Sequence, residues 1–309
     1  MSGFAEHAEE YLRLRRALGH KLADAGRLLP RFVAYLDSIA ATTITTELAL
    51  SWVLAPKADP ASSVWFRRMT VVRGFARHMS GIDPSTEVPP VGLVRFRSRW
   101  RPPFIYSAAE VEALMGAALR LVPTPMRAAT LHTLIGLLST TGLRVGEAIR
   151  LERCDIDWVE GVLVVRDSKF NKSREVPVHL STMDALARYA EIRDRYIPQP
   201  KHPTFFVSIA GTPVIYSDFG STFRELVSAC GVGAQSPVPA RIHGLRHSFA
   251  VRALVGWYRA GEDVDALLPR LSTYMGHLTP RYTYSYLSAA PELLALAASR
   301  LETATEPGK

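Results

Sequence analysis

The chain of 309 residues has only two cysteines, Cys154 and Cys230, which stand far apart and in no metal-binding spacing. Neither a disulfide framework nor a cysteine metal site is therefore expected, and a reducing, cytoplasmic compartment is indicated. No apolar run approaches the roughly 18 residues that a membrane span requires. The first residues lack the apolar stretch of a signal peptide. The sequence predicts a globular protein without membrane contact.

The charge is unevenly distributed. The formal net charge is +8 and the pI is about 9.6, which favours polyanionic partners. Residues 1–101 contain 15 Lys and Arg but only 9 Asp and Glu, whereas residues 102–309 contain 22 Lys and Arg and 20 Asp and Glu. The length exceeds what one core usually supports, so we expect two domains. The excess of positive charge in residues 1–101 favours a first domain that binds nucleic acid.

The first eighty residues predict a helical domain. Amphipathic patterns cover about 4–18, 22–38, 48–55 and 62–81, and Gly19 is a plausible stop for the first of these. Arg73 and Arg77 lie one turn apart in the fourth pattern and could reach backbone phosphates together. A solvated helix face explains the same two arginines equally well.

A break follows, with five prolines between 84 and 103 that forbid a continuous helix. In an extended chain, alternate side chains share one side. Four arginines stand at every second position of this segment, and their side chains could follow the backbone of a DNA duplex. A plain hydrated linker is compatible with the same pattern. The four are Arg95, Arg97, Arg99 and Arg101.

The second half predicts helices around one small antiparallel sheet. Ser107 and Glu110 have the spacing of a capping box, and helical periodicity follows to about 122 and again over 126–139. GVLVVRD (161–167) and REVPV (174–178) flank the polar turn SKFNK and predict a hairpin. A weaker strand pattern covers 204–214, and helices are expected thereafter.

Candidate catalytic residues stand in three separate segments. Arg144 follows TTG near a helix start, with Glu147 three positions later to brace its guanidinium. His243 and Arg246 are also three apart on a predicted helix and point to one side. Two arginines from separate helices can hold the oxygens of one phosphate. Either pair alone is more often structural.

The third segment contains His277 and, nine positions later, Tyr286. A phenol is a weak nucleophile because its pKa is near 10, unless cations stabilise the phenolate and a base accepts the proton. Tyr274, Tyr282 and Tyr284 are nearby, so composition alone does not select the tyrosine. An aromatic face that packs into the core is the alternative for all four.

These segments together resemble the tyrosine recombinases of the phage integrase family. TTGLRVGE is similar to the family's first arginine box, HGLRHSFA to its His-x-x-Arg box, and MGH with Tyr286 to its histidine–tyrosine box. RDSKFNKSREVPV resembles the hairpin that usually reads G-K-G-x-K-x-R-x-V-P, with Lys169 in the place of the catalytic lysine. YLSAAPELLALAA is most like the recombinases carried by transposons and integrated elements.

The resemblance implies a domain layout. A helical core-binding domain would cover residues 1–94, an Arg- and Pro-rich linker 95–106, and a catalytic domain 107–309, with a tail from about 288. The expected fold is mainly α, with a small antiparallel sheet in an α+β catalytic domain.

The resemblance also implies the chemistry. Tyr286 would attack the scissile phosphorus, forming a 3′-phosphotyrosine, and Lys169 would protonate the 5′ oxygen. Arg144, Arg246 and His277 would stabilise the transition state, His243 would accept the tyrosine's proton, and Glu147 would support Arg144. Neither ATP, metal nor other cofactor is expected, and the sequence has no phosphate-binding glycine loop and no carboxylate triad for two-metal chemistry.

Departures from the family's pattern and the neighbouring tyrosines leave two choices open. Ser168 and Phe170 replace the glycines of the hairpin turn, so Lys172 stays an alternative to Lys169. Tyr284 stays an alternative to Tyr286, although the spacing to His277 favours the latter.

The resemblance further implies partners. These are double-stranded DNA with inverted-repeat recombination sites and further copies of the chain, four in a synaptic complex, where other recombinases could work beside it. PELLALAASRLE (291–302) is apolar enough to be exchanged between neighbours, or to pack on its own domain. Action would be in the cytoplasm, at the nucleoid.

Parts of the sequence are also compatible with three other functions. His243, His247 and His277 could bind zinc, but Gly244 stands where a zinc protease needs glutamate. A DNA-binding protein without catalysis could use the same cluster for a structural phosphate. A topoisomerase relaxing DNA could use the same chemistry.

Overall fold

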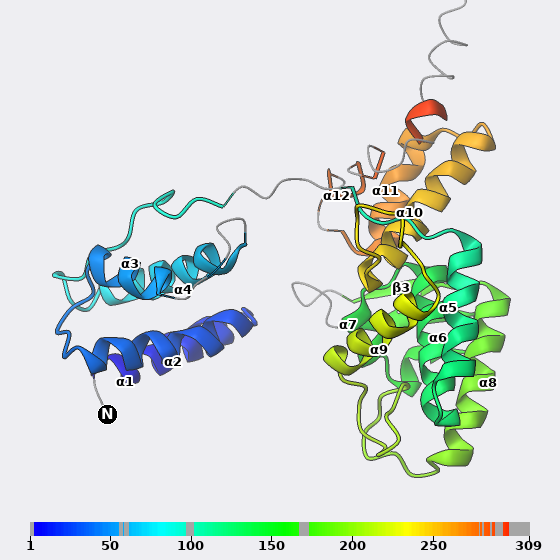
Figure 1. Ribbon diagram of the computed structural model, residues 1–309, viewed down its shortest axis with the longest axis horizontal. Helices are drawn as coiled ribbons and strands as arrows, with labels where there is room; N and C mark the ends of the chain where they lie inside the picture. Colours follow the sequence, from blue (N-terminus) through cyan, green and yellow to red (C-terminus); the bar gives the residue numbers. More distant parts are fainter. Residues whose placement is uncertain are drawn as a thin grey trace, which may run out of the picture. The chain divides into compact units, whose positions relative to one another are not determined.

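The computed structural model describes residues 3–55, 58, 62–96, 102–166, 173–277, 279, 281–284, 286–287 and 293–296. The chain divides into two compact units, residues 1–100 and 101–309. Helices dominate both units, and the described part contains one small antiparallel sheet (Figure 1). The predicted fold class, mainly α with a small antiparallel sheet, is confirmed.

The first unit is built from four helices, α1 (Gly3–Ala17), α2 (Ala23–Ser38), α3 (Thr46–Leu54) and α4 (Val64–Met79). Their apolar faces meet around Phe32 and Phe75, which are fully buried. Phe32 also packs edge-on against Trp52, with 5.1 Å between ring centroids. After α1, Gly19 has φ 84°, a conformation that suits glycine and ends the helix where the sequence predicted.

The second unit begins with three helices that lead into the candidate site. These are α5 (Ala108–Leu121), α6 (Pro125–Thr141) and α7 (Val145–Arg150). The predicted capping box is present, since Glu110 N donates to Ser107 Oγ at 3.2 Å and Ser107 N donates to Glu110 Oε2 at 2.8 Å. α6 is buried along most of its length and ends at Gly142, whose φ of 61° turns the chain toward α7.

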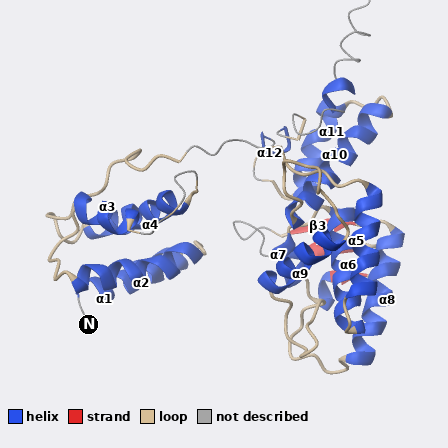
Figure 2. Ribbon diagram, viewed as in Figure 1, coloured by secondary structure: helices blue, strands red, loops and turns tan. Residues whose placement is uncertain are grey.

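The sheet follows, after a single 3₁₀ turn at Arg153–Asp155, and has the strand order β1 (Ile156–Asp157), β2 (Val162–Val165), β3 (Arg174–Pro177). Figure 2 shows these short strands among the surrounding helices. β2 and β3 form the predicted hairpin, in which the buried Leu163 faces the buried Val176. The turn at 168–172 lies outside the described residues.

The strand expected over 204–214 is not formed, and this prediction is wrong. Only two isolated bridges occur there, Glu152 with Thr204 and Val207 with Pro213. Phe205 and Phe206 are both fully buried, so side chains do not alternate between two faces as in a half-buried strand. Pro213 has no N–H to extend a ladder.

The helices that follow in the described part of the second unit include α8 (Leu180–Tyr196), α9 (Tyr216–Ala229), α10 (Ile242–Arg259), α11 (Val264–Met275) and α12 (Arg281–Tyr284). α10 packs against both α6 and α11. Its residues contribute to two hydrophobic clusters, Leu245 to the larger one and Leu254 to a smaller one beside α11. α10 therefore fixes the relative positions of the elements that carry the candidate site. Among the described helices, none is long and apolar enough to cross a membrane.

The end of the segment expected as linker packs onto the second unit. Tyr106 is 1% exposed, its N–H donates to Ser248 Oγ at 2.7 Å and its hydroxyl donates to Arg241 O at 3.0 Å. Gly244 permits this approach, because a Cβ there would lie 2.7 Å from Tyr106 Cε2. The aromatic side chain buries too much apolar area to stay in a hydrated linker, so ordered packing starts before residue 107.

Candidate active site

Arg144 lies at the N-cap of α7, as the sequence predicted. Its Nη1 is 2.6 Å from Glu147 Oε1, one turn further along, and its backbone N–H donates to Glu147 Oε2 at 3.0 Å. Its Nη2 donates to the carbonyl of Gly276 at 2.8 Å. The predicted brace between Glu147 and Arg144 is thus present, and the guanidinium is additionally fixed to the end of α11.

Arg246, on α10, is 3% exposed. Its Nη1 donates to Gly142 O, and its Nη2 donates to Met275 O at 2.7 Å. Because Met275 and Gly276 are consecutive, the guanidinium groups of Arg246 and Arg144 bind successive carbonyls of one short segment. Burial, followed by the charges of Arg144 and Arg174, lowers the pKa of Arg246 to about 10 against the opposing effects of Tyr286 and Glu147. The arginine stays charged at neutral pH, and an anion beside it would relieve the repulsion.

Arg174, at the start of β3, belongs to the same group of side chains as Arg144, Glu147 and Arg246, although the sequence reasoning did not select it. Its Nη2 is 2.8 Å from Glu147 Oε2, and its Nε donates to Tyr274 O at 2.9 Å. Burial alone would raise the pKa of Glu147, but the hydrogen bonds and charges of Arg174 and Arg144 outweigh it and hold this pKa at about 2. The sequence did offer a reason to select Arg174, because this residue stands at the arginine position of the K-x-R-x-V-P pattern of the hairpin.

Tyr286 is 4% exposed and lies against this cluster. Its ring stacks on that of His277, with 6.0 Å between centroids, and meets His247 edge to face at 5.3 Å. Burial raises the pKa of the Tyr286 hydroxyl, while the charge and hydrogen bond of Arg246 and the charge of Arg144 act in the opposite direction. The cations act on the phenol as expected, but burial outweighs them in the DNA-free protein.

Three histidines surround the phenol and the arginines. His277 Nδ1 is 2.8 Å from Thr283 Oγ1, and burial together with the nearby arginines lowers its pKa to about 4. His243 is an exposed residue, yet loss of hydration and the charges of Arg246 and Arg144 lower the pKa of its ring. His247 was considered in the sequence only as a zinc ligand. It lies between His243 and Tyr286, since its ring is perpendicular to that of His243 with 4.7 Å between centroids.

The other candidates from the sequence have different surroundings. Tyr274 donates its hydroxyl to Pro177 O at 3.1 Å and stacks on Phe249, so it packs structurally. Tyr284 is 46% exposed. The Tyr282 side chain lies outside the described residues, as do Lys169 and Lys172.

The arginines expected to contact DNA from the first unit differ in accessibility. Arg73 donates Nε to Pro89 O at 2.8 Å and Nη2 to Pro90 O at 2.9 Å, so its guanidinium anchors the chain after α4. Arg77 and Arg95 are exposed. The remaining members of the series, Arg97, Arg99 and Arg101, lie outside the described residues.

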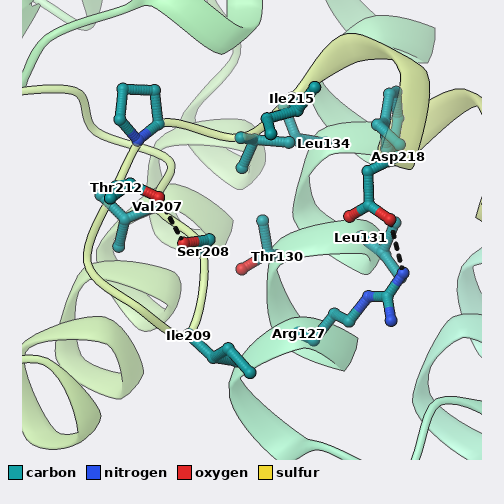
Figure 3. A pocket seen from close by; sticks show the side chains of 13 residues that line it. Arg127, Thr130, Leu131, Leu134, Val207, Ser208, Ile209, Thr212, Ile215 and Asp218 are labelled. Atoms are coloured by element: carbon teal, nitrogen blue, oxygen red, sulfur yellow. Dashed lines mark hydrogen bonds and ion pairs between the residues drawn. The ribbon is translucent and has the colours of Figure 1, made fainter.

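A separate hollow of about 230 Å³ lies between α6, α9 and the loop before α9. Figure 3 shows Leu131, Leu134 and Val207 around it, with the ion pair of Arg127 and Asp218 at one end. None of its lining residues belongs to the arginine–histidine cluster, which consists of Arg144, Arg174, Arg246, His243, His247 and His277. The described residues contain no group of three or more histidines, cysteines or carboxylates arranged to hold a metal ion.

Residues 106–292 match the sequence model of the phage integrase family. A proposed integrase/recombinase of Sinorhizobium fredii, y4rB, is 41% identical over 98% of both chains. A second similar protein, tyrosine recombinase XerD of Halalkalibacterium halodurans, is 26% identical, with 84% of this chain and 85% of that protein aligned.

Among solved structures, the Tn1549 transposon integrase in complex with a circular intermediate DNA superposes with a TM-score of 0.65. The alignment covers 97% of this chain and 99% of the integrase at 18% sequence identity. XerA recombinase superposes over 99% of this chain and 100% of its own, with a TM-score of 0.52 and 19% identity. At these identities the likeness concerns the fold.

Proposed function

The chain belongs to the phage integrase family and is a tyrosine site-specific recombinase, and on this premise we propose which of its side chains cut and rejoin DNA. Tyr286 attacks the scissile phosphorus and forms a 3′-phosphotyrosyl bond while the 5′ oxygen leaves. The partner strand's 5′ hydroxyl then reverses the step, so the bond energy is kept and neither ATP nor a metal ion is consumed.

Arg144 and Arg246 bind the non-bridging oxygens of that phosphate. The observation that carries this role is their attachment to the successive carbonyls of Gly276 and Met275, which sets two guanidinium groups beside the Tyr286 hydroxyl. Positive groups placed before the reaction stabilise the added charge of the transition state without reorganisation. Their charge also favours phenolate once DNA has displaced water.

The histidines and lysines complete the proton transfers. His277 donates to the phosphate, and His243, whose lowered pKa favours a neutral ring, accepts the proton that Tyr286 loses. Lys169 protonates the departing 5′ oxygen, with Lys172 as the alternative on the same turn. Glu147 orients Arg144 through the 2.6 Å contact.

Binding involves both parts of the chain. Residues 1–94 form a core-binding domain and 107–309 the catalytic domain, while the segment 95–106 joins them and its last residue, Tyr106, packs onto the second unit. The exposed Arg77 and Arg95 contact backbone phosphates together with Arg97, Arg99 and Arg101. Arg73 contributes through the guanidinium nitrogen not bonded to Pro89 and Pro90.

The partners follow from the same premise. The substrate is double-stranded DNA with inverted-repeat sites, on which four copies assemble, with the tail from about 288 exchanged or packed in place. Likeness of fold to a transposon integrase supports a role in a mobile element, in the cytoplasm at the nucleoid.

The test uses fluorescent duplexes that tile the DNA flanking the coding region, incubated in a metal chelator and resolved by denaturing electrophoresis. The expected result is a covalent protein–DNA adduct with the unmodified chain and none with Tyr286→Phe, while Tyr286→Phe still shifts the duplex in a native gel. Tyr284→Phe is the matched control and keeps the adduct. An adduct that survives Tyr286→Phe and disappears in Tyr284→Phe would reassign the nucleophile.

A further inference from the structure

In the described residues next to Tyr286, the backbone gives the phenol little support of its own. The preceding helix α12 spans four residues, Arg281–Tyr284. Beyond it, Tyr286 N donates to Thr283 O at 3.0 Å and Leu287 N donates to Tyr284 O at 3.1 Å. A turn of this length is too short to be stable by itself. The place of the nucleophile must therefore be set by what its side chain contacts.

One of these contacts comes from α10. This helix spans 18 residues, Ile242–Arg259, and packs against α6 and α11. It carries His243, Arg246 and His247 at spacings of three and four, so all three side chains leave the helix on one side. A contact from His247 to the phenol thus ties the nucleophile to the helix that also places the phosphate-binding arginine.

The contact has the geometry of an aromatic pair. The ring of His247 meets that of Tyr286 at 5.3 Å between centroids with an interplanar angle of 63°, and His277 stacks on the same phenol at 6.0 Å and 29°. Edge-to-face pairs of this kind prefer one relative orientation. Two imidazoles together fix the tilt of the phenol ring.

His247 makes no compensating polar contact at its Nδ1. In the described part of the chain no donor or acceptor reaches this buried atom. Leaving a polar atom without a partner costs stability. Burial, followed by the charges of His243 and Arg246, lowers the pKa of His247 to about 4, so the ring is neutral at pH 7. A contribution to the stability of the fold therefore does not explain why a histidine stands at position 247.

We infer that His247 is a positioning residue for the reaction, which holds the Tyr286 hydroxyl beside Arg246 through the contact between the two rings. The inference rests on the proposed function, since it takes Tyr286 as the nucleophile. His247 itself exchanges no proton with substrate and acts through the tyrosine.

The experiment measures the rate of adduct formation on the duplex found by tiling, at saturating and at half-saturating DNA, for His247→Ala and His247→Phe. A displacement of about 1 Å can cost about 100-fold in rate, and we expect His247→Ala to slow the saturated rate by about 10- to 100-fold. The half-saturating DNA concentration should change less than about 2-fold. His247→Phe keeps an aromatic edge and should recover the rate to within about 5-fold of the unmodified chain.

A matched control is His132→Ala, which removes a histidine of α6 whose Nδ1 lies 3.1 Å from Met115 O, outside the cluster. It should keep the saturated rate. The inference is overturned if His247→Ala reacts at the unmodified rate, if it loses DNA affinity in parallel with rate, or if His247→Phe is as slow as His247→Ala. No adduct with the unmodified chain would instead overturn the proposed function, and the inference with it.

Discussion

Glu147 and Arg174, 27 positions apart in the chain, form a bidentate ion pair. Arg174 Nη2 lies 2.8 Å from Glu147 Oε2, and Arg174 Nη1 lies 3.2 Å from Glu147 Oε1. The same carboxylate accepts a hydrogen bond from Arg144 Nη1. One buried negative charge therefore joins α7, which Arg144 precedes, to β3, which follows the hairpin turn. Arg144, which we propose binds the phosphate, and β3 therefore share a single support, Glu147.

Replacing Glu147 by Gln should destabilise the second unit and slow DNA cleavage. Removing one partner of a buried ion pair leaves the other charges uncompensated, and we expect a loss of about 3 kcal/mol in the free energy of unfolding. Urea unfolding followed by circular dichroism measures it. Glu110→Gln is the control, because Glu110 supports a capping box at the protein surface and its loss should cost at most about 1 kcal/mol. Equal losses in the two variants would contradict a special role for Glu147.

The same carboxylate predicts a dependence of stability on pH. The pKa of Glu147 is held at about 2, below its ordinary value of 4.5, so the folded protein binds fewer protons here than the unfolded chain. The stabilisation is complete above about pH 4.5 and is lost as the pH falls toward about 2. The difference in unfolding free energy between the unmodified chain and Glu147→Gln should therefore shrink across this window. A difference independent of pH would contradict the prediction.

The pairs close in sequence were predictable, and those distant in sequence were only partly so. Arg144 with Glu147 and His243 with Arg246 each lie three apart, and helical geometry alone places them together. The pair of Glu147 with Arg174 requires β3 to pack beside α7, which no local pattern determines. Arg174 stands in the hairpin pattern and Glu147 in the first arginine box, but the sequence did not show that the two are in contact.

Strand prediction succeeded where side chains alternate and failed where they do not. β2 and β3 pair with Leu163 opposite Val176, as the two β-rich runs predicted. The run over 204–214 is rich in β-formers, yet Phe205 and Phe206 are both buried and Pro213 interrupts the ladder. Tertiary burial outweighed propensity there.

Gly276 should not tolerate a side chain. Its φ of +67° strains any other residue, and a Cβ would lie 2.7 Å from Arg174 Nη1, with the carbonyl of Gly276 already bound to Arg144. Gly276→Ala should displace Arg174 and slow adduct formation at least about 10-fold, since small shifts in a catalytic site are costly. Gly261→Ala shares the positive φ, +75°, but meets nothing within 4 Å. This control should lose about 1 kcal/mol of stability and keep its cleavage rate.

Gly244 and Gly256 lie on the same helix, α10, and should respond to alanine in opposite directions. A Cβ at Gly244 would lie 2.7 Å from Tyr106 Cε2 and 2.8 Å from Phe104 O, whereas one at Gly256 would meet nothing within 4 Å. Gly256→Ala should stabilise the chain by about 0.5–1 kcal/mol, because alanine loses less entropy in a helix. Gly244→Ala should destabilise it by about 1–3 kcal/mol through overpacking against backbone that cannot move freely. Thermal melting of both variants measures the two effects, and a raised melting temperature for Gly244→Ala would show that residues 104–106 are not held against α10.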